Sequence, residues 1–80
     1  MVYTELMEST TIFRDFAKNL HELILSEGIT VNEFARRVGI PQPTVSRYLN
    51  CKREITVSNL VKIAAYFGED IDFLLGRKQY

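Results

Sequence analysis

The feature that most constrains the fold is a series of short segments in which apolar residues recur at helical spacing. Most of these segments end at a glycine. Gly28, Gly39 and Gly68 each follow such a segment. Glycine ends a helix readily because it adopts left-handed backbone angles. No run of alternating apolar and polar residues predicts a strand. The pattern therefore predicts an all-α fold. In the longest segment, the apolar residues recur at helical spacing over about four turns, at Ile12, Phe13, Phe16, Ala17, Leu20, Leu23 and Ile24.

Polar residues that cap helices mark where each predicted helix begins. The first helix is expected to start after Thr10 or Thr11 and to stop at Gly28. Thr30 caps a second helix and Thr56 a fourth, while the third lies within residues 42–50. A short fifth helix follows Asp70, and its apolar side suits packing against the first helix, with a homodimer surface as a second role. Five helices are therefore expected.

Eighty residues correspond to a single domain. We divide the chain into an N-terminal extension at residues 1–9 and a domain at 10–80. Three interpretations of the first eight or so residues remain: a frayed extension, a short extra helix, or a segment ordered by a partner. The composition, with 46% hydrophobic and 25% charged residues, is that of an ordinary soluble protein.

Several classes of function are excluded by residues that the chain lacks. One cysteine, Cys51, and one histidine, His21, cannot form an internal disulfide or a zinc site made by this chain alone. No nucleophile, base and orienting group can be assembled, and no glycine-rich phosphate loop is present, so we expect no enzyme activity, no cofactor, no metal and no small-molecule substrate. Without an apolar membrane span or a signal peptide, a cytoplasmic protein is expected.

The formal net charge is zero, but the charges are unevenly distributed. Residues 1–33 carry a net charge of −4 and residues 54–80 carry −1. Residues 34–53 carry +5 with no acidic residue, from Arg36, Arg37, Arg47, Lys52 and Arg53. Because salt screens charges beyond about 10 Å, a partner responds to this local field rather than to the net charge.

Two prolines stand at the start of the third predicted helix. A first-turn residue needs no backbone N–H for an internal hydrogen bond, so proline is tolerated there and presets the backbone. Pro43 is expected to be the first helical residue, with Gln42 on the cap side, because proline disfavours helical geometry in the residue before it. Only three or four residues then separate Gly39 from the helix, which is the spacing of a helix-turn-helix.

The segment "TVNEFARRVGIPQPTVSRYLNCKREIT" resembles the helix-turn-helix of the lambda-repressor-like family, also called the XRE or Cro type. Ala35 matches the small residue where the two helices cross, Gly39 the turn glycine, and Val45 and Tyr48 the apolar anchors of the recognition helix. The segment "NLVKIAAYFGEDIDFLLGR" resembles the family's fourth and fifth helices. The resemblance covers roughly residues 14–78 and implies the five-helix lambda-repressor-like fold.

The resemblance also implies that the third helix reads the major groove of double-stranded DNA. A glutamine amide offers both donor and acceptor, and an arginine binds guanine with two hydrogen bonds. Thr44 contacts a phosphate, or a base if the helix docks end-on. The implied base contacts are Gln42, Pro43, Ser46 and Arg47. The implied contacts to the DNA backbone are Thr44, Asn50, Lys52, Arg53 and Arg36, with Arg37 as a further candidate.

Three positions depart from the family pattern. Val31 replaces a frequent glutamine that touches a phosphate, and Leu49 replaces a frequent glutamate. Cys51 replaces the glycine after the recognition helix; if that position is left-handed, the side chain costs on the order of 1 kcal/mol.

The function implied by the resemblance is sequence-specific DNA binding by a transcriptional regulator, of the repressor type, from a bacterium, a phage or a mobile element. Two copies are expected to bind a palindromic site with half-sites about 34 Å apart. The alternative is a protein-interaction module of the same fold, such as an antitoxin or adaptor, since the first third of the chain is acidic and fold does not determine function.

Overall fold

The computed structural model describes residues 2–78, with side chains described from residue 12 onward. This part of the chain forms five α-helices and no strand, which confirms the all-α, five-helix prediction. The helices are α1 (Val2–Glu27), α2 (Val31–Val38), α3 (Gln42–Leu49), α4 (Val57–Phe67) and α5 (Ile71–Leu74).

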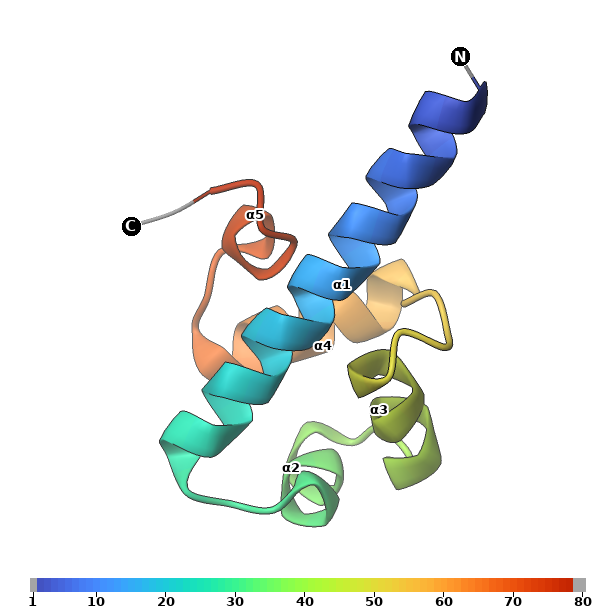
Figure 1. Cartoon of the computed structure of the whole chain (residues 1–80). Helices are drawn as coiled ribbons and strands as arrows, with labels where there is room; N and C mark the ends of the chain where they lie inside the picture. The colour runs from blue at the N-terminus through green and yellow to red at the C-terminus, as the bar shows by residue number, and fades with distance from the viewer. Residues whose placement is uncertain (1, 79–80) are drawn as a thin grey trace.

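The long helix α1 forms the spine of the molecule. The four shorter helices gather around its C-terminal part, while its first turns extend beyond them (Figure 1). Its 26 residues span about 39 Å at the usual rise of an α-helix. This length accounts for the longest dimension of the molecule, 40 Å.

The start of α1 differs from the sequence-based prediction. The helix begins at Val2 and passes through Thr10 and Thr11, so the prediction that one of these threonines caps it was wrong. Residues 2–11 contain neither glycine nor proline, and Glu5, Leu6 and other good helix formers carry the helix past the two threonines. The division of the chain into residues 1–9 and 10–80 stays a prediction.

The predicted caps of the later helices are confirmed. The side chains of Thr30, Thr56 and Asp70 each accept a hydrogen bond from a backbone N–H in the first turn of the helix that follows. At the other ends, Gly39 and Gly68 have left-handed φ angles of 78° and 65°. Short-range hydrogen-bonding chemistry therefore determines where α2, α4 and α5 begin and where α2 and α4 end.

One hydrophobic core joins all five helices. Burial of these apolar side chains supplies the main favourable free energy that holds α2 and α3 against α1. The core residues are Phe16, Leu20, Ile24, Phe34, Ala35, Ile40, Val45, Tyr48, Ile63, Ala64 and Leu74.

The expected packing of α5 against α1 is confirmed by a polar contact as well as by the core. The side-chain amide of Asn19 on α1 donates hydrogen bonds to the carbonyl oxygens of Phe73 at 2.9 Å and Leu74 at 3.2 Å. These carbonyls lie in the last turn of α5, and that of Phe73 also accepts from the backbone N–H of Gly76 at 3.0 Å. Asn19 therefore fixes the C-terminal end of α5 to the middle of α1.

Candidate nucleic-acid interface

Helix α3 begins one residue earlier than the sequence predicted. Gln42 is its first residue and Pro43 its second, while Pro41, with φ −55° and ψ 138°, occupies the capping position. The carbonyl oxygen of Pro41 accepts from the backbone N–H of Val45 at 3.1 Å, which starts the helical hydrogen-bond pattern. Since Pro43 still lies within the first turn, its missing N–H costs nothing. The two prolines stiffen this turn, and the cap-side placement of Gln42 was wrong.

The two sides of α3 differ sharply in exposure. Val45 and Tyr48 are buried, with exposed fractions of 0% and 2%, as expected of anchors in the core. Gln42, Pro43 and Arg47 are exposed to solvent. Ser46 and Thr44, which were also predicted to meet DNA, are half-buried. The helix is therefore held by its apolar side and presents its polar side outward.

Two of the predicted base-contact residues are already joined to each other. The side-chain amide nitrogen of Gln42 donates a hydrogen bond of 2.8 Å to the hydroxyl oxygen of Ser46, one turn further along α3. The bond restricts the glutamine side chain and leaves its oxygen and second amide hydrogen available. An amide that is held in place before binding loses less conformational entropy when it meets a partner.

Asn59, which the sequence analysis did not single out, holds α3 from behind. Its side-chain amide nitrogen donates a 2.8 Å hydrogen bond to the hydroxyl oxygen of Tyr48, and so joins α4 to α3. From α1, the ring of Phe16 contacts the ring of Tyr48 edge-on, with 6.2 Å between the ring centroids. Because Tyr48 is buried, its hydroxyl needs such a partner. These contacts fix the position and tilt of α3 relative to the core.

The C-terminal end of α3 has the hydrogen bonds of a Schellman motif. The backbone N–H of Lys52 donates to the carbonyl of Arg47 at 2.8 Å, and the N–H of Cys51 donates to that of Tyr48 at 3.1 Å. This motif requires a left-handed residue, and Cys51 has φ 57°, so the condition raised for this position is met. Asn50 adds a hydrogen bond of 2.9 Å from its side-chain amide to the carbonyl of Ser46. The loop after α3 is thereby given a defined path.

The segment that follows α3 carries unpaired positive charge. Lys52 and Arg53 are exposed, and neither forms an ion pair with another residue in the part of the chain that the structure describes. The same holds for Arg47 on α3 itself. Three cations therefore stand at one end of the exposed side of α3 without an ion-pair partner among the described residues.

Arg36 and Arg37 lie in a different electrostatic setting. Both pair with Glu33, one turn earlier on α2, at 2.6 Å from the Arg36 guanidinium and 2.8 Å from that of Arg37. Hydrogen bonds from Arg36 and then Arg37 lower the pKa of the Glu33 carboxyl and keep it ionised. The cluster therefore carries one net positive charge rather than two. The arginine-rich segment counted from residue 34 thus overstates the local charge, because Glu33 reaches into it.

Comparison with known proteins identifies the arrangement. The sequence pattern of a helix-turn-helix family matches residues 20–74, which span α2, α3, α4 and α5 completely. The chain belongs to the lambda-repressor-like helix-turn-helix family. Among solved structures it is similar to a hypothetical transcription factor, NHTF, from Neisseria: the TM-score is 0.74 at 28% identity, over 80% of this chain and 74% of that one. No curated protein matches the chain.

Within this helix-turn-helix, the two apolar departures from the family pattern are both half-buried. Val31 is half-buried and packs against the core at the start of α2. Leu49, which the sequence left without an account, is half-buried and packs against the same core from the end of α3. Neither side chain can donate a hydrogen bond to a phosphate. Any contact of this edge of the helix-turn-helix with a phosphate must come from other residues.

The described residues also bear on other kinds of site. No described helix is long and apolar enough to cross a membrane. Among residues 12–78, no three side chains of the metal-binding types lie close enough together to hold an ion.

Proposed function

We propose that the protein is a transcriptional regulator that binds double-stranded DNA with α3 in the major groove. The observation that carries the proposal is the division of α3, in a member of the helix-turn-helix family, into a buried anchoring side and an exposed polar side. Gln42 and Arg47 project from the exposed side, where nothing described covers them. A helix of this kind fits the width of the major groove and can reach base edges.

The proposal assigns each predicted contact a role. Arg47 donates two hydrogen bonds to a guanine, and Gln42 uses its amide on an adenine, held in place by Ser46. Pro43 offers an apolar contact to a thymine methyl group. The contacts to phosphates come from the half-buried Thr44 and the exposed Asn50, Lys52, Arg53 and Arg36.

Arg36 has a competing partner in this scheme. Its guanidinium lies 2.6 Å from Glu33 and must be shared with, or released to, a phosphate. With about five phosphate contacts per chain, the logarithm of affinity is expected to fall with the logarithm of salt concentration with a slope near −4 to −5 per half-site.

We propose further that two copies bind a palindromic site and act as a repressor. Exposed apolar side chains on α4 and α5 support a second copy as the partner. Val57 is 77% exposed and Val61, one turn later, 49%, while Ile71 on α5 is 37% exposed. Sedimentation velocity with and without a palindromic duplex tests this, and a single copy on one complete palindrome would contradict it.

Selection of bound sequences from a random duplex pool tests the main proposal and supplies the recognised sequence. A shared motif of two inverted half-sites is expected. With that duplex, Arg47→Ala should weaken binding by about 1–3 kcal/mol and relax base preference at one position. Lys52→Ala should weaken the selected and a random duplex equally. Equal losses on both duplexes for both variants would refute the division into base and phosphate contacts.

The second candidate is a protein-interaction module of the same fold, an antitoxin or adaptor. The same exposed apolar residues of α4 and α5, together with the acidic first third of the chain, favour it. Fluorescence anisotropy at two salt concentrations separates the candidates. Absence of binding to any duplex at low salt favours the interaction module.

A further inference from the structure

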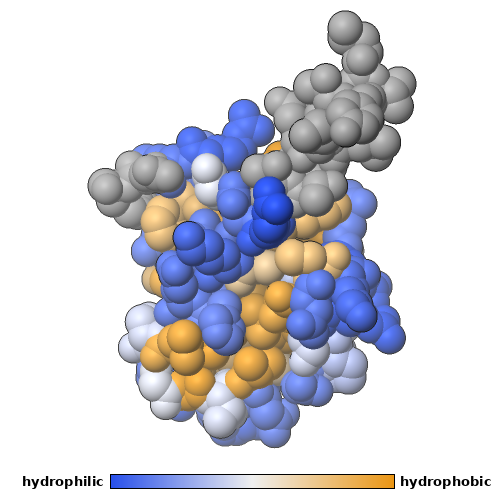
Figure 2. Space-filling view, viewed as in Figure 1, coloured by the Kyte–Doolittle hydropathy of each residue, from blue (hydrophilic) through white to orange (hydrophobic). Residues whose placement is uncertain are grey.

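A groove runs between α1 and the helix-turn-helix, next to the exposed side of α3. It has a volume of about 520 Å³ and is open to solvent. Figure 2 shows an apolar strip in this place, bordered by hydrophilic residues. The residues that line the groove are Arg14, Ala17, Lys18, His21, Val31, Ser46, Leu49, Asn50 and Cys51.

The rim of this groove on α1 is basic. Arg14, Lys18 and His21 are spaced by four and three residues, so they share one side of the helix. All three are exposed, and no carboxylate is among the residues that line the groove. Neither Arg14 nor Lys18 forms an ion pair with another described residue. The rim therefore offers two permanent cations whose charge is not neutralised within the groove.

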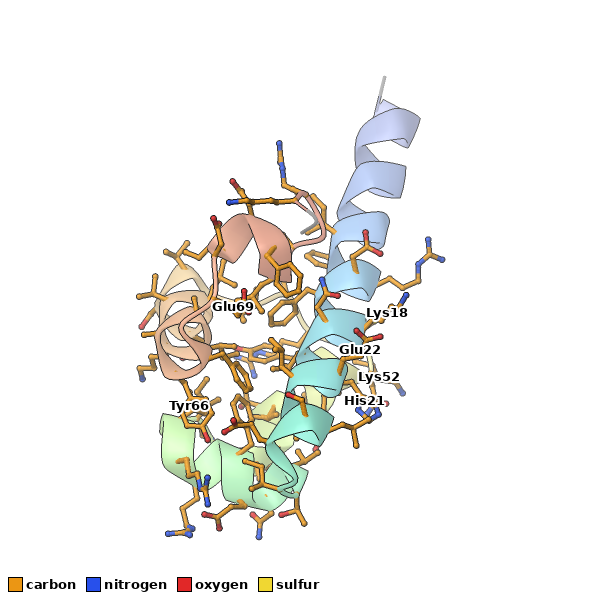
Figure 3. All side chains as sticks on the ribbon, turned by 90° about the vertical axis from the view of Figure 1, so that its left-hand side faces the viewer. Lys18, His21, Glu22, Lys52, Tyr66 and Glu69 are labelled. Carbon is orange, nitrogen blue, oxygen red and sulfur yellow. The ribbon has the colours of Figure 1, made fainter. Side chains whose placement is uncertain are left out.

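The opposite rim belongs to the surface already proposed to bind DNA. Ser46 and Asn50 of the α3 segment line the groove, and Cys51 leads directly to Lys52. Figure 3 shows Lys18, His21 and Lys52 on the same side of the molecule, away from α4 and α5. The groove thus continues the predicted phosphate-contacting loop toward α1.

The groove combines an apolar floor with basic residues at its rim, which suits a sugar-phosphate strand. Ala17, Val31 and Leu49 line the groove with apolar side chains, which cannot hydrogen-bond to phosphate but can pack against deoxyribose. The cations stand above them at the edge. When α3 lies in the major groove, a sugar-phosphate strand borders it on either side. The strand beside Ser46 and Asn50 would then run over this groove.

We infer that the groove between α1 and α3 seats the sugar-phosphate backbone of the bound duplex, with Arg14 and Lys18 as phosphate-binding residues. The inference rests on the proposed function and extends it to a helix that the sequence analysis left without a role. Arg14 and Lys18 lie before residue 20, outside the segment that matches the family pattern. They add two phosphate contacts to the five already proposed.

The test measures salt dependence of binding by fluorescence anisotropy, on the selected duplex and on a random one. Arg14→Gln combined with Lys18→Gln removes both charges and keeps good helix formers on an exposed helix side. The slope of log affinity against log salt is expected to become shallower by about 1.8 per half-site. Affinity at 100 mM salt should fall at least about tenfold, by the same factor on both duplexes, since phosphates carry no sequence information.

Lys62→Gln is the matched control, because Lys62 is an exposed cation on α4 and does not line the groove. It should leave the slope unchanged. A single charge reversal, Lys18→Glu, should weaken binding more than Lys18→Gln. Circular dichroism melting of each variant shows whether the fold is retained.

The outcomes separate this inference from the function on which it rests. If the wild-type protein binds no duplex at low salt, both are overturned. If the wild-type protein binds and Arg47→Ala relaxes base preference, while the double variant behaves like Lys62→Gln, only the inference about the groove is overturned.

Discussion

Replacing Cys51 with glycine is expected to stabilise the protein, although it removes a side chain. The hydrogen bonds that end α3 require a left-handed residue here, and Cys51 has φ 57°. A residue with a Cβ pays about 1–2 kcal/mol for this conformation. Glycine removes that cost. Its greater conformational freedom in the unfolded chain destabilises the folded protein by roughly 0.5–1 kcal/mol, so the free energy of unfolding is expected to rise by a net of about 0.5–1 kcal/mol.

The gain can be measured as a shift in melting temperature. For a chain of 80 residues, the usual entropy of unfolding converts 1 kcal/mol into about 6 °C, so Cys51→Gly should raise Tm by about 3–6 °C. Differential scanning calorimetry under reducing conditions is the assay. Cys51→Ala keeps the backbone strain and removes only the thiol, whose long contact of 3.8 Å to the carbonyl of Phe13 adds little. It should not raise Tm.

Gly39 provides the reverse control. It ends α2 with φ 78°, and a Cβ added there meets no atom within 4 Å, so Gly39→Ala isolates the backbone cost. We expect it to lower Tm by an amount similar to the rise for Cys51→Gly. If Cys51→Gly melts at or below the temperature of Cys51→Ala, the strain argument is refuted.

Three further predictions concern polar contacts, two beside the candidate interface and one at the start of α5. Asn59→Ala should lower the free energy of unfolding by about 1–3 kcal/mol, because it leaves the buried Tyr48 hydroxyl without its partner; in urea denaturation, a loss no greater than that of Tyr48→Phe would contradict this. Lys78 and the N–H of the second helical residue of α5 lower the pKa of Asp70 below its ordinary value of 3.8. The stabilising effect of the Asp70 carboxylate is therefore present above that pH and is lost as the pH falls through the lowered pKa. In this acid range, the Tm of Asp70→Asn should depend less on pH than the Tm of the wild-type protein. Parallel Tm profiles of the two proteins would argue against the contact. Glu33→Gln should release Arg36, whereas Arg37 keeps its interaction with Tyr66, and should tighten binding to any duplex by up to about fivefold at low salt; unchanged anisotropy titrations would show that Arg36 does not meet DNA.

Much of the fold could be predicted from the sequence because its determinants are local. Thr30, Thr56 and Asp70 cap helices through hydrogen bonds within one turn, and a glycine ends a helix through its own backbone. The start of α1 could not be predicted in this way. Thr10 and Thr11 are good caps, but a helix that is already under way passes through them, and no breaker precedes them.

The division of α3 into a buried and an exposed side agrees with the sequence-based expectation, but the contacts among the residues around it could not be predicted. The exposed side of α3 was expected from the resemblance to the family, which placed Val45 and Tyr48 as its apolar anchors. Glu33 was missed because charges were counted in blocks along the chain, although its spacing of three and four residues from the two arginines would have revealed the pairs. The contact of Asn59 with Tyr48 depends on how α4 crosses α3, which no local pattern contains. The groove likewise depends on which side of α1 faces α3.

The central claim is that the exposed side of α3 meets the duplex, and NMR titration tests it most directly. Backbone amide shifts of the labelled protein would be followed as the selected duplex is added. The account predicts that the largest changes fall at residues 42–53. Changes confined to α4 and α5, or no changes at saturating duplex and low salt, would contradict it.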